Sequence, residues 1–113
     1  MDSAEFLCPS GAIIEGEFHE LNATVAGEQR FLVATRQSGT VRAWINICPH
    51  QGRPLNWAPG RFLSDNHGNL VCSAHGAVFE PLEGRCIDGP CQNACLTPVP
   101  VSEQDDRVWL DPA

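Results

Sequence analysis

The chain has 113 residues, a formal net charge of −7 and 42% hydrophobic residues. This length fits one compact domain, and the hydrophobic fraction is high enough to form a core. The 7 Lys and Arg residues form no cluster, so the chain lacks the basic stripe that nucleic-acid binding needs. It also lacks the roughly 18 consecutive apolar residues of a membrane span and the features of a secretory signal. We therefore expect a single cytoplasmic domain over residues 1–113, with neither nucleic acid nor a membrane as partner.

The sequence predicts short strands and no sustained helical period. In chain order, strands are expected over residues 18–25, 30–36 and 40–47, with turns at 27–28 and 38–39 between them. A short strand around Phe62 follows, then strands over 70–73 and 77–80, and a loop-rich stretch over 81–90. Strands 96–101 and 107–110 are expected to form a closing hairpin with 102–106 as its turn. Pro98 and Pro100 cannot donate to a ladder and favour an edge position. The predicted fold is all-β, a small antiparallel sandwich or barrel.

Two segments each place a Cys close to a His. The first is CPHQGRP at residues 48–54, and the second is CSAHGAVF at residues 72–79. The four candidate ligands are Cys48, His50, Cys72 and His75. In a cytosolic protein such a pattern indicates a metal site more often than a disulfide framework. Zinc fingers usually draw two Cys from one segment and two His from another, whereas here each segment supplies one of each. This mixed arrangement suits a binuclear centre, in which one iron takes both thiolates and the other takes both imidazoles.

The C-x-H and C-x2-H pairs, each followed closely by Gly, resemble the signature of Rieske [2Fe–2S] proteins. The resemblance implies a Rieske-like antiparallel β fold, in which two ligand loops form a cluster-binding part over about residues 46–92. It also implies that Cys48, His50, Cys72 and His75 bind one Rieske-type [2Fe–2S] cluster. Gly89-Pro90 stands where Rieske domains cover their cluster with a Pro-containing loop, although an ordinary turn would also explain it. A mononuclear zinc site with the same four ligands is the alternative.

Four positions depart from the respiratory Rieske pattern. Respiratory members carry an extra Cys in each ligand loop, and the matching residues here are Arg53 and Ala74. They also carry a Ser and a Tyr whose hydroxyls donate to the cluster sulfurs, and Ala77 and Phe79 stand at those positions. Such donors stabilise the more negative reduced cluster, so their loss predicts a low reduction potential. The resemblance is therefore to low-potential Rieske ferredoxins without the loop disulfide, although the segment between the two ligand loops is longer than in that group.

We expect a one-electron carrier that passes electrons from a reductase to a terminal oxygenase. The chain would be an electron-transfer component and not an enzyme by itself, and it would be a monomer. One alternative is a small redox subunit of a larger reductase complex. The other is a zinc-stabilised β binding module without a redox role.

Four cysteines remain outside the signature: Cys8, Cys86, Cys91 and Cys95. Their spacing fits no common zinc or cluster motif. A disulfide between Cys86 and Cys91 is conceivable, but a reducing cytosol does not support it. We interpret all four as spare thiols. Among the acidic residues, Asp65, Glu80 and Asp88 are candidates for guiding a redox partner.

Overall fold

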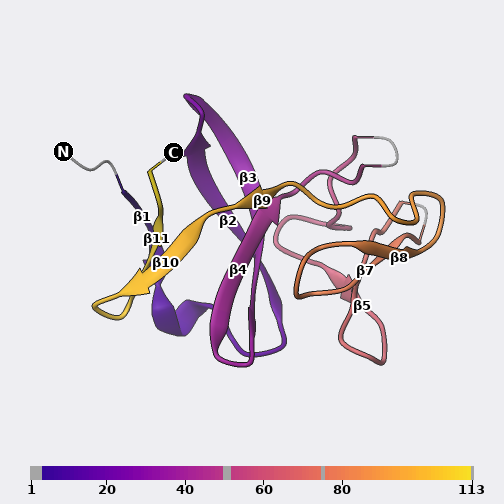
Figure 1. Ribbon diagram of the computed structural model, residues 1–113, viewed down its shortest axis with the longest axis horizontal. Coiled ribbons are helices and arrows are strands. Elements are labelled where there is room, and N and C mark those ends of the chain that lie inside the picture. Colours follow the sequence, from indigo (N-terminus) through magenta and orange to yellow (C-terminus); the bar gives the residue numbers. More distant parts are fainter. Residues whose placement is uncertain (1–3, 50–51, 75, 113) are drawn as a thin grey trace.

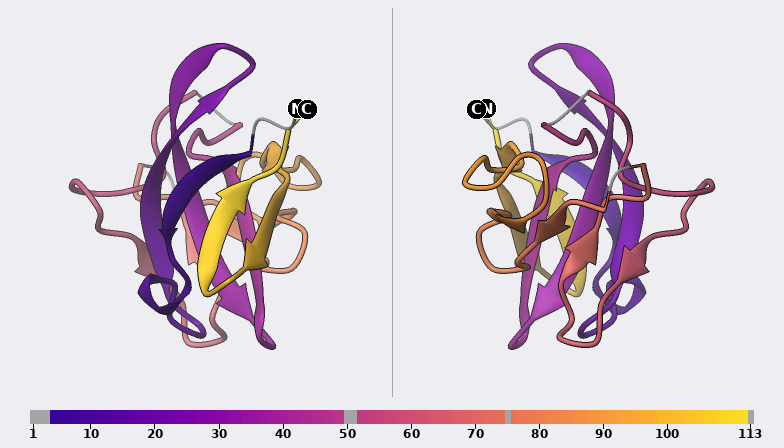
Figure 2. Two further views of the ribbon diagram at one scale, coloured as in Figure 1. Left: turned by 90° about the vertical axis from the view of Figure 1, so that its left-hand side faces the viewer. Right: turned by 90° about the vertical axis from the view of Figure 1, so that its right-hand side faces the viewer.

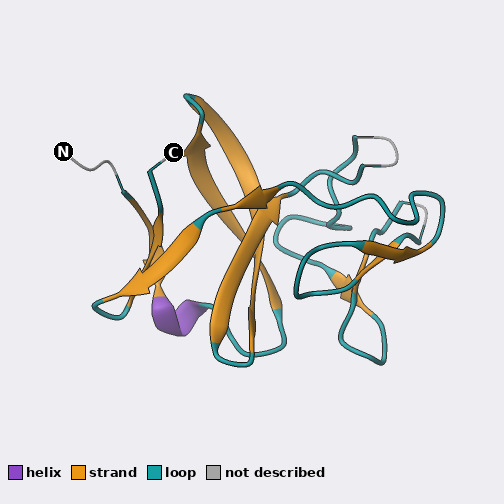
Figure 3. Ribbon diagram, in the orientation of Figure 1, coloured by secondary structure: helices purple, strands orange, loops and turns teal. Residues whose placement is uncertain are grey.

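The computed structural model describes residues 4–49, 52–74 and 76–112. It contains one short 3-10 helix and otherwise strands and loops (Figure 3). The elements are β1 (Glu5–Pro9), η1 (Ser10–Ala12), β2 (Phe18–Val25), β3 (Glu28–Gln37), β4 (Thr40–Ile45), β5 (Leu63–Ser64), β6 (Leu70–Val71), β7 (Val78–Phe79), β8 (Cys86–Asp88), β9 (Pro98–Val99), β10 (Val101–Gln104) and β11 (Arg107–Leu110). Within the described residues, no helix is long and apolar enough to cross a membrane.

The strands form three antiparallel sheets. The first has the order β1-β11-β10, the second β2-β3-β4-β9 and the third β5-β6-β7-β8. Figure 1 shows the first two sheets side by side and the third at the opposite end from the first, and Figure 2 gives the two end views. The all-β antiparallel prediction is thus confirmed.

Two apolar cores correspond to this division. One core joins residues of the first two sheets, among them Leu21, Leu32, Val99 and Val108. The other lies under the third sheet and includes Leu70, Phe79 and Leu96. Trp44 of β4 belongs to the second core. The second sheet therefore also packs against the part of the chain that carries the two Cys/His segments.

The closing segment differs from the predicted hairpin. Residues 96–101 do not form one strand. β9 pairs with β4 at the edge of the second sheet, whereas β10 pairs with β11 in the first sheet. Pro100 separates the two strands, and its missing N–H helps to end one ladder before the next begins. The turn is also shorter than the predicted 102–106, because β10 continues to Gln104. The expected edge position of Pro98 is confirmed.

Other strand boundaries also differ from the prediction. The first hairpin turns at Ala26 and Gly27, both with positive φ, and Glu28 already belongs to β3. β1 was not expected. A strand, β8, lies within the stretch that was predicted to be loop-rich, and it pairs with β7. Both missed strands are short, and their alternation is too brief to identify them without their partner strands.

Candidate metal centre

The two Cys/His segments have the same backbone hydrogen bonds. The N–H of Cys48 donates to the carbonyl of Arg53 at 2.7 Å, and the N–H of Cys72 donates to the carbonyl of Ala77 at 2.8 Å. The N–H of Gly52 returns to the carbonyl of Cys48 at 2.9 Å, and that of Gly76 to Cys72 at 3.0 Å. The backbone around the cysteine therefore has the same hydrogen-bonding pattern in both loops.

A glycine four residues after the cysteine makes this shared turn possible. Gly52 has a φ of +69° and Gly76 a φ of +76°, values that L-residues with a Cβ rarely adopt. Their N–H groups bond to the cysteine carbonyls and so close the turn of each loop. The equal Cys-to-Gly spacing was visible in the sequence, although the spacing from His to Gly differs between the loops.

Both cysteine side chains face the interior. Cys48 is 2% exposed and Cys72 is 1% exposed, and both belong to the second core. The loops are also tied directly to each other. The N–H of Ser73 donates to the carbonyl of Leu55 at 3.2 Å, and its hydroxyl donates to the carbonyl of Asn56 at 3.1 Å. The predicted ligands His50 and His75 lie outside the described residues. The two thiols fit a shared soft metal group, since they are buried in the same core and are held by loops with equivalent hydrogen bonds.

A buried asparagine fixes the first loop and was not identified from the sequence. Asn46 is 4% exposed and directly follows β4. Its Oδ1 accepts the N–H of Leu55 at 2.9 Å, and its Nδ2 donates to Oδ1 of Asn56 at 2.8 Å. Satisfied polar groups of this kind define one loop conformation. The only signal for it was a polar residue within the apolar run WINIC.

The Gly89-Pro90 segment packs against the second loop. A Cβ on Gly89 would lie 2.8 Å from the Cα of Ala77, so only glycine permits this approach. Several backbone hydrogen bonds stabilise the segment, including Cys86 N–H to the carbonyl of Ala94 at 2.7 Å and Asn93 N–H to the carbonyl of Cys86 at 2.9 Å. The contact with Ala77 supports a covering segment over an ordinary surface turn.

Two of the spare cysteines, Cys86 and Cys91, pack in the same core as Cys48. Sγ of Cys91 is 3.3 Å from Sγ of Cys86, and Sγ of Cys86 is 3.2 Å from the carbonyl oxygen of Asp88. Burial, followed by interactions with Cys86 and then with Cys48, raises the pKa of Cys91 to about 12. No sequence pattern indicated that Cys91 meets both Cys86 and Cys48.

The three candidate acidic residues each stabilise a turn. Oδ1 of Asp65 accepts the N–H groups of His67 and Asn69, each at 2.9 Å. Glu80 accepts three backbone N–H groups between Leu82 and Arg85. Burial would raise the pKa of Glu80, but the three hydrogen bonds outweigh it and lower that pKa. Asp88 accepts the N–H of Gly89 at 2.9 Å. Their negative charges are thus held in fixed positions.

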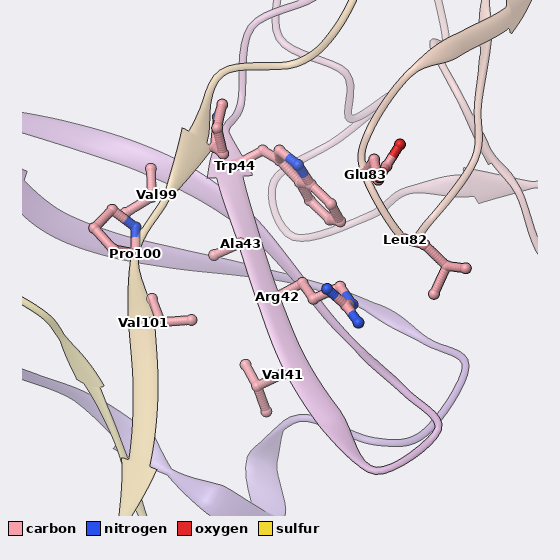
Figure 4. A pocket seen from close by; sticks show the side chains of 10 residues that line it. Val41, Arg42, Ala43, Trp44, Leu82, Glu83, Val99, Pro100 and Val101 are labelled. Atoms are coloured by element: carbon pink, nitrogen blue, oxygen red, sulfur yellow. The ribbon is translucent and has the colours of Figure 1, made fainter.

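Two of the grooves in the described part of the chain bear on the position of the site. One has a volume of about 410 Å³, and residues of both ligand loops line it together with Trp57, which is 55% exposed. The other has a volume of about 470 Å³ and lies between β4, the β9–β10 segment and the turn at Leu82 and Glu83. Figure 4 shows Trp44 and Arg42 reaching from β4 toward this turn. Residues of the ligand loops do not line the second groove, so the first is the one associated with the metal centre.

Comparison with known proteins identifies the family. The Rieske [2Fe-2S] domain model matches residues 4–103. Oxidoreductase NdmD of Pseudomonas putida is 35% identical over 99 residues, which are 80% of this chain and 16% of that protein. The oxygenase component of dicamba O-demethylase from Stenotrophomonas maltophilia is 32% identical over 80 residues, covering 66% of this chain and 22% of that protein. The chain thus spans about a fifth of the length of these curated relatives or less.

Solved structures share the fold. The Sphingomonas yanoikuyae B1 ferredoxin superposes with a TM-score of 0.71 at 22% identity, over 98% of this chain and 100% of that chain. The terminal oxygenase of carbazole 1,9a-dioxygenase from Nocardioides aromaticivorans IC177 gives a TM-score of 0.73 at 22% identity, over 97% of this chain and 30% of that chain. The family match confirms the predicted resemblance and cofactor, and it favours the iron–sulfur cluster over the zinc alternative. With two buried thiols presented by matching loops, the chain belongs to the Rieske [2Fe–2S] domain family, and its cofactor is a Rieske-type cluster.

Proposed function

We propose that this chain is a one-electron carrier whose [2Fe–2S] cluster is held by Cys48, His50, Cys72 and His75. The observation that carries the proposal is the pair of equivalent loops, which present two buried cysteines to one core. When bound, a Rieske cluster gains or loses one electron, and neutral imidazoles in place of two thiolates make the gain easier. The residues of this chain would hold the cluster, and the burial of Cys48 and Cys72 would exclude water from its thiolate side.

The partners belong to the same proposal. A reductase would supply the electron and a terminal oxygenase would accept it, with the chain acting as a cytoplasmic monomer. The similarity to the oxygenase component of dicamba O-demethylase and the shared fold with a ferredoxin support a place in an oxygenase system. The similarity to Oxidoreductase NdmD favours a second candidate, in which the chain is the redox component of a larger reductase assembly. Co-purification with a reductase would distinguish the second candidate from the first.

Metal and sulfide analysis tests the ligand assignment. The isolated protein should contain about two irons and two acid-labile sulfides per chain and give the EPR signal of a reduced Rieske centre. Cys48→Ala and Cys72→Ala should each lose the cluster, because iron binds the thiolate and each cysteine is one of four ligands. Cys95→Ala is the matched control, since Cys95 is exposed, and it should keep full iron and sulfide content. One zinc without sulfide, or an intact cluster in Cys72→Ala, would overturn the assignment.

A further inference from the structure

Two neighbouring cysteines, Cys86 and Cys91, have no role in the function proposed so far. Cys86 belongs to β8 and is fully buried, whereas Cys91 lies in the segment that follows Gly89-Pro90 and is partly buried. Sγ of Cys91 lies 3.3 Å from Sγ of Cys86. Cys91 also packs against the core that contains Cys48, and its side chain interacts with that of Cys48. A thiol that is not a predicted ligand therefore lies directly beside a predicted cluster ligand.

Counting donors and acceptors shows where the Cys91 proton can go. The Cys86 thiol donates to the carbonyl of Asp88 at 3.2 Å, so its sulfur remains an acceptor. Cys91 has one proton and two sulfur acceptors, Cys86 and Cys48. A cysteine that binds iron is a thiolate, and a hydrogen bond to a charged acceptor is roughly twice as strong as one to a neutral acceptor. In the cluster-bound protein, the Cys48 sulfur is consequently the preferred acceptor.

The backbone holds Cys91 in position for this contact. Its carbonyl accepts the N–H of Ala94 at 2.9 Å, and the carbonyl of Gly89 accepts the N–H of Gln92 at 3.3 Å. The preceding Gly89 is in contact with the backbone of Ala77. The segment is therefore fixed at both sides of Cys91, and a fixed donor loses little entropy when its hydrogen bond forms.

We propose that Cys91 donates an S–H···S hydrogen bond to the Cys48 thiolate and thereby raises the reduction potential of the cluster. The inference rests on the proposed ligand role of Cys48. The added electron makes the reduced cluster more negative, so a donor to a ligand sulfur stabilises the reduced state more than the oxidised state. Cys91 is then a tuning residue that partly replaces the hydroxyl donors missing at Ala77 and Phe79.

A redox titration of three variants tests the proposal. Cys91→Ala removes the donor and should shift the reduction potential downward. Cys91→Ser keeps a donor at the same place and should restore the potential to the parent value or above it. Cys95→Ala is the matched control, because it removes an exposed thiol from the same segment, and its potential should equal that of the parent. Iron and sulfide contents measured in each variant ensure that the potentials refer to intact clusters.

A second readout reports the hydrogen bond itself. After exchange into D₂O and reduction, electron–nuclear double resonance should detect an exchangeable deuteron coupled to the cluster that is lost in Cys91→Ala and present in Cys95→Ala. If Cys91→Ala does not fold, Cys91→Ser still tests the inference, because a stronger O–H donor must then raise the potential.

The outcomes separate this inference from the proposed function. Absence of iron and sulfide in the parent protein would overturn both. An intact cluster with equal potentials in the parent and Cys91→Ala would overturn only the role of Cys91. A Cys86–Cys91 disulfide in the isolated protein, detected as a mass lower by two hydrogens, would also overturn it, because the donor proton would be gone.

Discussion

Glycine has a steric role at Gly84, in the turn between β7 and β8. A Cβ on Gly84 would lie 2.6 Å from Nε1 of Trp44, and Trp44 is only 3% exposed. The N–H of Leu96 donates to the carbonyl of Gly84 at 2.8 Å, which fixes the backbone at this contact. The turn between β7 and β8 therefore rests on the indole ring of β4. Through this contact the second sheet positions the third.

We predict that Gly84→Ala lowers the free energy of unfolding by about 2–4 kcal/mol, since it adds overpacking to an unfavourable positive φ. Gly60→Ala is the matched control, because Gly60 has a φ of +70° but open space around it. That change should cost only about 1 kcal/mol of backbone strain. Urea unfolding followed by tryptophan fluorescence measures both variants. Equal losses in the two would show that the contact with Trp44 does not matter.

At the scale of the elements, Arg36 of β3 joins segments that are distant in sequence. Its guanidinium donates to Oε1 and Oε2 of Glu103 in β10 at 2.9 and 2.8 Å. It also donates to the carbonyls of Ser10, Ile13 and Gly39 at 2.9, 2.8 and 3.1 Å. All five guanidinium donors are thus used, and only arginine has this geometry. The contact ties the second sheet to the first and to the segment around η1.

We predict that Arg36→Lys lowers the free energy of unfolding by about 2 kcal/mol or more, because an ammonium group cannot make both bonds to Glu103 and reach the carbonyls. Arg30→Lys is the matched control. Arg30 pairs with Glu28 at 3.8 Å on an exposed surface, and such pairs contribute little. Thermal or urea unfolding at neutral pH measures the difference. A similar effect of both substitutions would show that the hydrogen bonds of Arg36 contribute no more to stability than an exposed ion pair.

The ion pair between Arg36 and Glu103 also predicts that stability depends on pH. The hydrogen bond from Arg36 lowers the pKa of Glu103 below its ordinary value of 4.5. A carboxyl with a lowered folded pKa contributes stability above its unfolded pKa, and that stability is lost as pH falls through the folded pKa. The difference in unfolding free energy between the parent and Glu103→Gln should therefore be constant from pH 7 to about 5 and shrink below pH 4.5. A difference that grows in acid would contradict this sign.

For the whole molecule, the two cores differ in what they require. The core between the first two sheets contains long strands, and β2 and β3 pair over eight positions. The third sheet has strands of two or three residues, and both predicted thiolate ligands belong to its core. Sheets of such short strands have little stability of their own. The bound cluster therefore supplies folding free energy mainly to the third sheet.

We predict that removal of the cluster exposes the third sheet and leaves the first two folded. Hydrogen–deuterium exchange of the iron-free protein should show lost protection in β6, β7 and β8. Protection in β2, β3 and β4 should be retained, because these strands unfold only with the larger core. Holoprotein under the same conditions is the control. Uniform loss of protection along the chain would show instead that the two cores unfold as one unit.

The net charge gives a further prediction at this scale. With a formal net charge of −7, association with a basic electron donor should weaken as salt rises, since screening shortens electrostatic steering. Reduction rates measured from low to high ionic strength test this. Rates that stay constant would indicate apolar docking, for which the exposed Trp57 beside the loop groove is the candidate.

The sequence by itself determined the fold class, the family and the cofactor. Iron–sulfur chemistry needs particular donors at particular local spacings, so Cys48, His50, Cys72 and His75 could be proposed without a structure. The longest strands were also predictable, because their alternation repeats over many residues. The ligand assignment and the single-domain boundary at 1–113 stay predictions.

Only the tertiary structure decided which distant residues meet. Three contacts join segments that are separate in sequence. Arg36 binds Glu103, Gly84 packs against Trp44, and Cys91 lies beside Cys48. Local patterns carry no information about such contacts, because they depend on which sheets pack together and where the chain crosses between them. The change of sheet at Pro100 is of the same kind. The sequence thus predicted the candidate cluster ligands, and packing decided which residues surround the two candidate cysteines.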